Sequence, residues 1–403
     1  MKILVLNSGS SSQKSALYEL GDCLPAEPPQ PLWEASIEWN GGSAKTRIRS
    51  LARKIIDDHT VVADRQSAIE QMLRSLWTGR TQVIHSTSEI NVVGHRIVHG
   101  GPRLARPTVI TPEVEAIISS VAAFAPLHNR AELEGIEIIN RLVGLVSQVA
   151  VFDTGFHRTL PPAAAVYPGP YEWYEGGIRR YGFHGINHEY CAQRAAQLLG
   201  RNGSSLKLVS CHLGNGCSLA AIRGGQSVDT TMGFTPLEGL MMGTRSGSVD
   251  PGILTYLLRQ NAMPWQQLDD LLNKKSGLLG VSGISGDMRE IQSAIQAGNA
   301  RAKLAFEIYV HRLQQGIGAM AASLGGIDAL IFTAGVGEHS PEVRAETCEK
   351  LGFLGIQLDP QKNAQSPADE VISCPDSPVK VLIIHAQEDW AIAKTCWGVA
   401  RSE

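Results

Sequence analysis

Short apolar runs recur along the chain, and each is followed at once by polar turn residues. Five of them stand out, at residues 3–6, 149–152, 208–211, 329–332 and 381–384. Apolar runs of this length between turn residues predict buried strands of a sheet. Ligands of open α/β sheets bind beyond the carboxyl ends of such strands, so the five polar loops that follow are expected to converge on one cleft.

Other segments have the spacing of helices. Thr111, Pro112 and Glu113 form a helix start, with an N-cap, a proline at the first helical position and an acid in the first turn. Further along, five apolar residues recur at the intervals of one helix face: Phe306, Val310, Leu313, Ile317 and Met320. Strand and helix patterns together predict an α/β fold.

A short internal echo indicates a duplication. The strand, Gly/Ser loop and second strand of residues 4–20 are echoed by residues 208–222. This similarity favours two related halves that face a central cleft, with coincidence as the alternative. Prolines mark a loop at residues 25–31, and no chemistry stands out in residues 20–90.

Length and composition narrow the class of protein. A chain of 403 residues is long enough for two or three domains with a sizeable core. Its 36 basic and 39 acidic residues give a net charge of −3, so no global field recruits nucleic acid or an anionic membrane. The seven scattered cysteines contain no C-x-x-C pair, which argues against disulfides and structural zinc. Without an apolar stretch long enough for a signal peptide or membrane span, we expect a soluble cytoplasmic protein.

Three loops have the composition of phosphate cradles, although the familiar Walker A and G-x-G-x-x-G signatures are absent. Residues 7–12 place small and hydroxyl side chains in a turn between two strands, where backbone N–H groups can approach an oxyanion, and Lys14 adds a charge. Residues 212–216 and 335–338 are similar loops. Each alone is equally compatible with a plain turn, but three at strand ends favour a nucleotide.

Candidate charged groups lie in glycine-rich surroundings. Residues 94–101, 179–185 and 243–247 set Arg and His among Gly and apolar residues, where a desolvated cation needs an anionic partner. Asp153 and Glu388 each follow a strand and are candidate Mg²⁺ carboxylates, with helix capping as the alternative.

His128 has two interpretations. It stands just before Asn129, a predicted N-cap, so it is either a functional residue or merely a residue at a helix start.

Eleven segments, matched in order from end to end, carry a family resemblance: residues 7–12, 94–101, 125–129, 151–154, 179–185, 212–216, 243–247, 276–282, 287–289, 333–338 and 351–355. In these segments the chain resembles acetate kinase. The resemblance implies reversible, Mg²⁺-dependent phosphoryl transfer between ATP and acetate, giving acetyl phosphate and ADP, with Mn²⁺ as an alternative metal. It also implies a homodimer and the duplicated, ribonuclease H-like α/β fold shared with sugar kinases, Hsp70 and actin.

The same resemblance implies a division into domains. Residues 1–154, closed by 389–403, would form an N-terminal acyl kinase domain. Residues 155–388 would form a C-terminal domain for nucleotide binding and dimerisation, with ATP in the central cleft.

Positions that match the family's motifs receive expected roles. Catalysis falls to Arg96, Asp153, His184 and Arg245, and the metal to Asn7 and Glu388. The acyl and phosphoryl site would be lined by Arg96, Val98, His128, Phe183 and Pro236. The nucleotide would be held by Lys14, His212, Leu213, Gly214, Asn215, Gly216, Asp287, Met288, Arg289, Gly335, Val336, Gly337, Glu338 and His339. His339, Arg130 and Gly155 depart from the family's usual Asn, Pro and Ala.

The implied reaction explains why these residue types are needed. A carboxylate is already an anion at neutral pH, so it needs no general base. It is repelled by the phosphate, at a cost on the order of 4 kcal/mol per charge pair at 4 Å. Arg96, Arg245, Mg²⁺ and hydrogen bonds from His184 would offset this repulsion and support direct in-line transfer. On this hypothesis Asp153 positions the metal or its waters rather than acting as a base.

Three alternatives have distinct signatures. A propionate or butyrate kinase is the nearest, but the β-branched Val98 should crowd longer chains, a discrimination of about 1–3 kcal/mol per methylene. By resemblance, hydroxyl kinases of this superfold carry Asp where this chain has Asn7. A catalytically inactive nucleotide-binding module would lack one of the charged site residues, and none is missing here.

Overall fold

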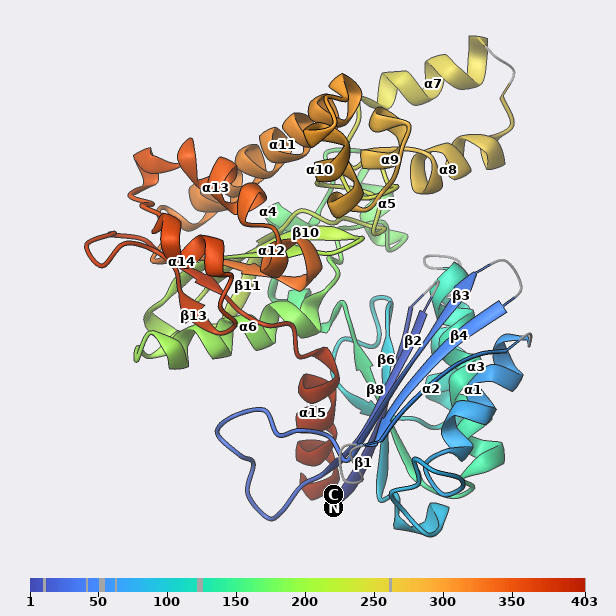
Figure 1. Cartoon of the computed structure of the whole chain (residues 1–403). Helices are drawn as coiled ribbons and strands as arrows, with labels where there is room; N and C mark the ends of the chain where they lie inside the picture. Colours follow the sequence, from blue (N-terminus) through green and yellow to red (C-terminus); the bar gives the residue numbers. More distant parts are fainter. Residues whose placement is uncertain are drawn as a thin grey trace. The chain divides into compact units, whose positions relative to one another are not determined.

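The computed structural model describes residues 1–9, 12–40, 43–50, 55–61, 64–121, 126–260 and 263–402, without the side chains of residues 40, 55, 61, 126–130 and 260. The chain forms two compact units (Figure 1). Unit 1 comprises Met1–Gly155 and Gln387–Glu403, and unit 2 comprises Phe156–Ala386. None of the described helices is both long enough and apolar enough to cross a membrane.

Unit 1 is built on an eight-stranded sheet of order β5-β4-β3-β2-β1-β6-β8-β7. The strands are β1 Lys2–Ser8, β2 Ser12–Glu19, β3 Trp33–Asn40, β4 Ser43–Ser50, β5 Ile55–Val61, β6 Val92–Ile97, β7 Thr108–Val109 and β8 Ser147–Phe152. β1, β6 and β8 pair in parallel, and the other pairs are antiparallel. The carboxyl ends of three neighbouring strands therefore share one edge of the sheet.

Helices cover both faces of this sheet. They are α1 Arg65–Arg74, α2 Pro112–Ser120, α3 Pro126–Leu142 and α15 Glu388–Ser402, with a 3-10 turn at Thr87–Glu89. Leu4 and Val93 share a buried core with Ile138 of α3, whereas Gly94, the next residue of β6, faces Cys396 of α15. Because successive strand residues point to opposite faces, α3 and α15 lie on opposite sides of the sheet (Figure 1).

Unit 2 repeats the same plan. Its six-stranded sheet has the order β11-β10-β9-β12-β14-β13, with β9 Lys207–Leu213, β10 Cys217–Arg223, β11 Gln226–Thr230, β12 Ala329–Thr333, β13 Glu370–Val371 and β14 Lys380–Ile383. β9, β12 and β14 are parallel, as β1, β6 and β8 are in unit 1. The echo between residues 4–20 and 208–222 thus corresponds to two equivalent antiparallel hairpins, β1–β2 and β9–β10.

Helices of unit 2 surround its sheet. They are α4 Pro162–Ala165, α5 Tyr171–Glu175, α6 Gly185–Leu198, α7 Pro251–Gln260, α8 Trp265–Lys274, α9 Gly277–Ser282, α10 Met288–Gln296, α11 Ala300–Leu324, α12 Ala334–His339, α13 Pro341–Glu349 and α14 Pro360–Gln365. Shorter 3-10 turns lie at Gly155–Thr159, Gly203–Ser205 and Gly352–Leu354. The predicted helix face from Phe306 to Met320 is buried in α11.

Most predicted elements are confirmed. All five apolar runs form strands, and Thr111 caps α2 by accepting the amide of Val114 at 3.3 Å. Of the five loops that follow these strands, two belong to unit 1 and three to unit 2.

Two local predictions are wrong. Residues 335–338 form part of helix α12, although glycine weakens helices. The reason is tertiary: the buried guanidinium of Arg344 donates to the carbonyls of Gly337 and Glu338 at 2.8 and 2.9 Å. Asn129 is not an N-cap, because α3 already begins at Pro126, and proline suits the first helical position.

Gly94 lets α15 pack closely against β6, which yields a stability prediction. A Cβ at this position would lie 2.6 Å from Cys396 Sγ and 2.8 Å from Ile392 Cγ2. We expect Gly94→Ala to lower the free energy of unfolding by about 1–3 kcal/mol, measured by urea denaturation. Gly398→Ala, in α15 and with no neighbouring atom within 4 Å, should be neutral or stabilising. Equal stability of Gly94→Ala and wild type would contradict the close approach.

Candidate active site

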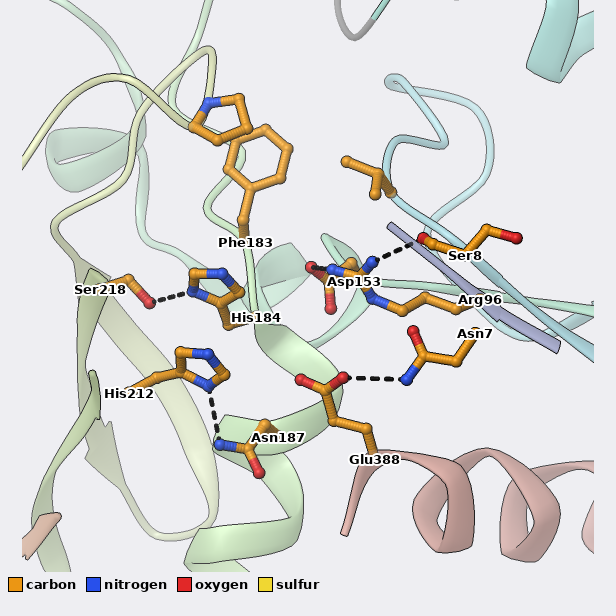
Figure 2. A network of polar contacts seen from close by, with 12 residues as sticks. Asn7, Ser8, Arg96, Asp153, Phe183, His184, Asn187, His212, Ser218 and Glu388 are labelled. Carbon is orange, nitrogen blue, oxygen red and sulfur yellow. Dashed lines mark hydrogen bonds and ion pairs between the residues drawn. The ribbon is translucent and has the colours of Figure 1, made fainter. Parts of the chain in front are cut away.

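A cluster of charged groups lies at the shared edge of β1, β6 and β8 in unit 1 (Figure 2). Asn7 belongs to the end of β1, Arg96 to β6, and Asp153 follows β8 directly. The parallel register brings these positions together, although they are far apart in the sequence.

Arg96 is a fixed cation at the centre of this cluster. Its Nη2 donates to Asp153 Oδ2 at 2.8 Å, and its Nη1 donates to the carbonyl of Ser8 at 3.2 Å. Burial alone would lower the pKa of Arg96, but the carboxylates of Asp153, Glu388 and Glu132 outweigh it and raise the pKa above its ordinary value. Its Nε is buried without a hydrogen-bond partner among the described residues.

Glu132 of α3 belongs to this cluster, although the sequence analysis did not single it out. It is 2% exposed, and its two carboxyl oxygens accept the backbone amide of Val98 at 3.0 and 3.1 Å. Burial raises the pKa of Glu132 to about 8, against the opposing effect of Arg96. A sequence signal existed, because Glu132 lies four and seven residues before Ile136 and Ile139 on the buried face of the helix.

Oxygen-bearing side chains form the metal candidate. Asn7 Nδ2 donates to Glu388 Oε2 at 3.1 Å and to Asp389 Oδ1 at 2.9 Å. Burial raises the pKa of Asp389, another residue that the sequence analysis missed. Amide and carboxylate oxygens are the donors that Mg²⁺ prefers, so the residue types fit. No group of three His, Cys, Asp or Glu residues in the described ranges could hold a metal alone, so phosphate and water oxygens would have to complete its shell.

Lys14 and Val98 occupy different surroundings in unit 1. Lys14 pairs with Asn7 in the β1–β2 register and is exposed. Val98 follows β6 and is buried, with its amide held by Glu132. The side chain of His128 lies outside the described residues.

A pair of stacked histidines marks unit 2. The rings of His184 and His212 lie 3.9 Å apart and nearly parallel, at 9°. His184 caps α6 with φ of +55°, a left-handed conformation that is strained for a residue with a side chain. Its Nδ1 is 2.9 Å from Ser218 Oγ, and His212 Nδ1 is 2.9 Å from Asn187 Nδ2 (Figure 2).

Arg245 lies against the same glycine as His184. A Cβ at Gly216 would be 3.4 Å from Arg245 Nη1 and 3.4 Å from His184 Nε2, so both groups lie directly beside this glycine. Arg245 Nη1 also donates to the carbonyl of Pro236 at 3.2 Å, and burial lowers the pKa of Arg245. Phe183 is buried, and its carbonyl is 3.0 Å from His157 Nε2.

A cavity of about 510 Å³ in unit 2 has the size of a nucleoside site. Eight of the predicted nucleotide residues line it: Gly214, Asn215, Asp287, Met288, Arg289, Gly335, Val336 and His339. Gly286, Gln292 and Ser340 complete the lining and were not predicted. The remaining candidates of unit 2, His212, Leu213, Gly216, Gly337 and Glu338, do not line this cavity.

Glu338 instead binds the last residues of unit 2, just before the chain returns to unit 1. Its carboxylate accepts the amide of Ala386 at 3.0 Å and lies 2.5 Å from His385 Nδ1. Asp287 also has a local role, because it caps α10 by accepting the amide of Arg289 at 2.9 Å. Capping and ligand binding are compatible for this residue.

The model of the acetokinase family matches residues 2–394 of the chain. The chain belongs to the acetokinase family. Among its relatives, a protein of Gloeobacter violaceus described as acetate kinase is 61% identical, over 98% of this chain and 99% of the relative. An acetate kinase of Nostoc punctiforme is 58% identical over the whole of both chains. The family resemblance predicted from the motifs is thereby confirmed.

Solved structures of similar proteins agree with the fold. The acetate kinase of Porphyromonas gingivalis has a TM-score of 0.89 at 40% identity, covering 99% of each chain. A propionate kinase of Francisella tularensis has a TM-score of 0.88 at 36% identity, covering 98% of this chain and 99% of the other. The predicted α/β fold with two related sheets is confirmed.

The buried carboxyl of Glu132 makes stability depend on pH. Its pKa of about 8, against an ordinary 4.5, means that the folded state keeps a proton that the unfolded chain releases between these values. Stability contributed by this group is therefore lost as pH rises to about 8. We expect the Tm of wild type to fall, relative to Glu132→Gln, by roughly 5 °C between pH 5 and 8 and to level off above.

Differential scanning fluorimetry at stepped pH measures this difference. Glu137→Gln, at an exposed position of the same helix, serves as the matched control and should follow the wild-type curve. Parallel curves for Glu132→Gln and wild type would show that the carboxyl does not titrate in this range.

Proposed function

We propose that this member of the acetokinase family catalyses the reversible phosphorylation of acetate by ATP, giving acetyl phosphate and ADP. The observation that supports it most is the buried guanidinium of Arg96, oriented by Asp153 and Ser8. Its Nε lacks a hydrogen-bond partner among the described residues, as expected for a group that awaits an anion. The buried Val98 nearby in sequence is the proposed apolar wall for the methyl group.

The proposed chemistry is direct in-line transfer. Acetate is ionised at neutral pH, so no side chain has to remove a proton. The permanent charge of Arg96 would bind the carboxylate and offset its repulsion by phosphate. Asp153 is engaged by Arg96 at 2.8 Å, which favours a role in orienting that cation and nearby ligands over a role as a base.

Unit 2 would bind the nucleotide and the transferring phosphoryl group. Eight matched residues line the cavity proposed for ATP or ADP. His184 and Arg245 both lie beside Gly216 and are the proposed donors to the transferring phosphoryl group. Unit 1 is accordingly the proposed acyl-binding domain, and unit 2 the nucleotide-binding domain.

Mg²⁺ is the proposed metal, with Mn²⁺ as an alternative. Asn7 and Glu388 are the residues that would hold it, with Asp153 close by in the same cluster. When bound, the ion neutralises phosphate charge and orients the phosphate oxygens. The chain's own contribution is to keep Asn7 and Glu388 together through their 3.1 Å hydrogen bond.

Acyl phosphate formation, trapped as the hydroxamate, tests the reaction. We expect a strong signal with acetate, less with propionate and little with butyrate, because each added methylene costs about 1–3 kcal/mol against Val98. Equal or better turnover of propionate would instead favour the specificity named for the Francisella tularensis relative. No signal with any acid, in folded protein that binds ATP, would contradict the kinase proposal.

The same assay tests the metal. Chelation of divalent cations should abolish the signal, and added Mg²⁺ should restore it. Asp153→Asn should lose activity by a factor that shrinks as Mg²⁺ is raised if Asp153 acts on the metal. A loss of activity that added Mg²⁺ does not change would indicate that Asp153 acts only by orienting Arg96.

A homodimer is also proposed, in the cytoplasm, where the seven free cysteines would stay reduced. Unit 2 exposes aromatic and aliphatic side chains on neighbouring helices α7 and α8, among them Ile253, Tyr256 and Trp265. A second copy of the chain would cover them. We expect light scattering to give twice the chain mass, and Tyr256→Lys to shift it toward the monomer; a monomeric wild type would contradict the proposal.

A further inference from the structure

A chain of alternating imidazole and hydroxyl groups runs from His184 into the interior of unit 2. His184 Nδ1 lies 2.9 Å from Ser218 Oγ, which lies 2.8 Å from His188 Nε2. His188 Nδ1 in turn lies 2.9 Å from Ser210 Oγ. Ser218, His188 and Ser210 are completely buried, so this chain is sealed from solvent on its inner side.

Regular secondary structure fixes these groups in place. His184 and His188 are one helical turn apart at the start of α6, so they lie on the same face. Ser218 pairs with His212 in the β9–β10 register, and Ser210 lies two residues before His212 on β9. The two serines therefore occupy the same face of the sheet, toward α6.

Counting protons restricts the directions of the hydrogen bonds in this series of imidazole and hydroxyl groups. The hydroxyl of Ser218 has one proton and lies between two ring nitrogens, so it donates to one ring and accepts from the other. His188 is kept neutral, because burial lowers its pKa far below the ordinary value, and therefore carries a single N–H. If Ser210 donates to His188, then His188 donates to Ser218 and Ser218 donates to His184 Nδ1.

This direction has a consequence at the outer end. When Nδ1 of a neutral imidazole accepts a hydrogen bond, the ring proton must sit on Nε2. Nε2 of His184 lies beside Gly216, as Nη1 of Arg245 does, and a Cβ at this glycine would be 3.4 Å from either atom. The reverse direction would leave a neutral His184 with a bare lone pair there, which would repel an incoming phosphate oxygen.

We propose that Ser218 and His188 are positioning residues that hold the proton of His184 on Nε2, so that this ring donates a hydrogen bond to the transferring phosphoryl group. Ser218 acts on His184 directly, and His188 acts through Ser218. The proposal deepens the proposed kinase function and rests on it for the role of His184, but the position of the proton is independent of any substrate.

Nuclear magnetic resonance of the full-length protein, labelled with ¹⁵N in histidine, tests the proton position. Long-range ¹H–¹⁵N correlations distinguish the two neutral tautomers, and a His184→Gln variant assigns the His184 signals. We expect the Nε2–H tautomer in wild type and a mixture in Ser218→Ala, which lacks the donor to Nδ1. A bare Nε2 in wild type, or an unchanged tautomer in Ser218→Ala, would overturn the proposal.

Kinetics test the consequence for phosphoryl transfer. Ser218→Ala should lose roughly tenfold in kcat, the scale of one lost buried hydrogen bond, with KM for ATP and acetate changed less than about threefold. Ser218→Thr keeps the hydroxyl on a strand, where β-branched residues are favoured, and should recover most of kcat. A kcat of Ser218→Ala within twofold of wild type would overturn the positioning role.

Ser227→Ala is the matched control. Ser227 is also a buried serine of the same sheet, and its hydroxyl lies 2.7 Å from Nδ1 of the buried His157 outside this chain of groups. It should keep the wild-type kcat and His184 tautomer. An equal loss in both alanine variants would assign the effect to packing and overturn the proposal. If wild type forms no acyl phosphate, the kinase function fails, while the tautomer measurement still decides whether the proton of His184 is held on Nε2.

Discussion

The buried charge of Arg96 is the constraint on which unit 1 depends. A guanidinium taken out of water is stable only beside carboxylates, and removing one partner from such a buried pair costs about 3–5 kcal/mol. Asp153 supplies the direct contact at 2.8 Å, and Glu388 adds negative potential from the start of α15. The end of β6, the residue after β8 and the start of α15 therefore meet around one cation.

Unit 2 instead places two stacked histidine rings at its candidate site. Its histidines lie on a strand end and a helix start, and their ring nitrogens are engaged by Ser218 and Asn187. Donors whose orientation is fixed before substrate arrives stabilise developing charge without reorganisation. Gly216 brings the backbone close to His184 and Arg245, since even a Cβ there would lie only 3.4 Å from their nitrogens.

Local patterns predicted the strands that carry the site, because short apolar runs ending in turn residues have few other interpretations. The antiparallel strands of residues 33–61 were missed, although Ala44, Thr46 and Ile48 alternate with exposed residues on β4. Helix α12 was mistaken for a loop, since the hydrogen bonds that stabilise it come from the side chain of Arg344 in the following helix, α13, which reaches back seven and six residues. Local propensity contains no such information.

Individual site residues divide in the same way. Arg96 and Asp153 were recognised because their motifs resemble a family. Glu132, Asp389 and Ser218 were not, because each acts through a partner that only the tertiary register brings near. Gln292 of α10, which lines the cavity in unit 2, was likewise missed. Its amide donates at 2.8 Å to Ser340, the N-cap of α13. Sequence motifs therefore reveal the candidate ligand-binding residues more readily than they reveal the residues that orient them.

The discontinuity of unit 1 has a consequence for biosynthesis. α15 covers one face of the sheet that β1 and β6 form, and it brings Glu388 to Asn7, yet it is made only after all of unit 2. A nascent chain that has emerged as far as residue 386 can therefore complete unit 2 while the earlier unit still exposes an apolar sheet face. Unit 1 can therefore be completed only after α15 has been synthesised. A product truncated before α15 would lack both the cover of this sheet face and Glu388, a proposed metal ligand.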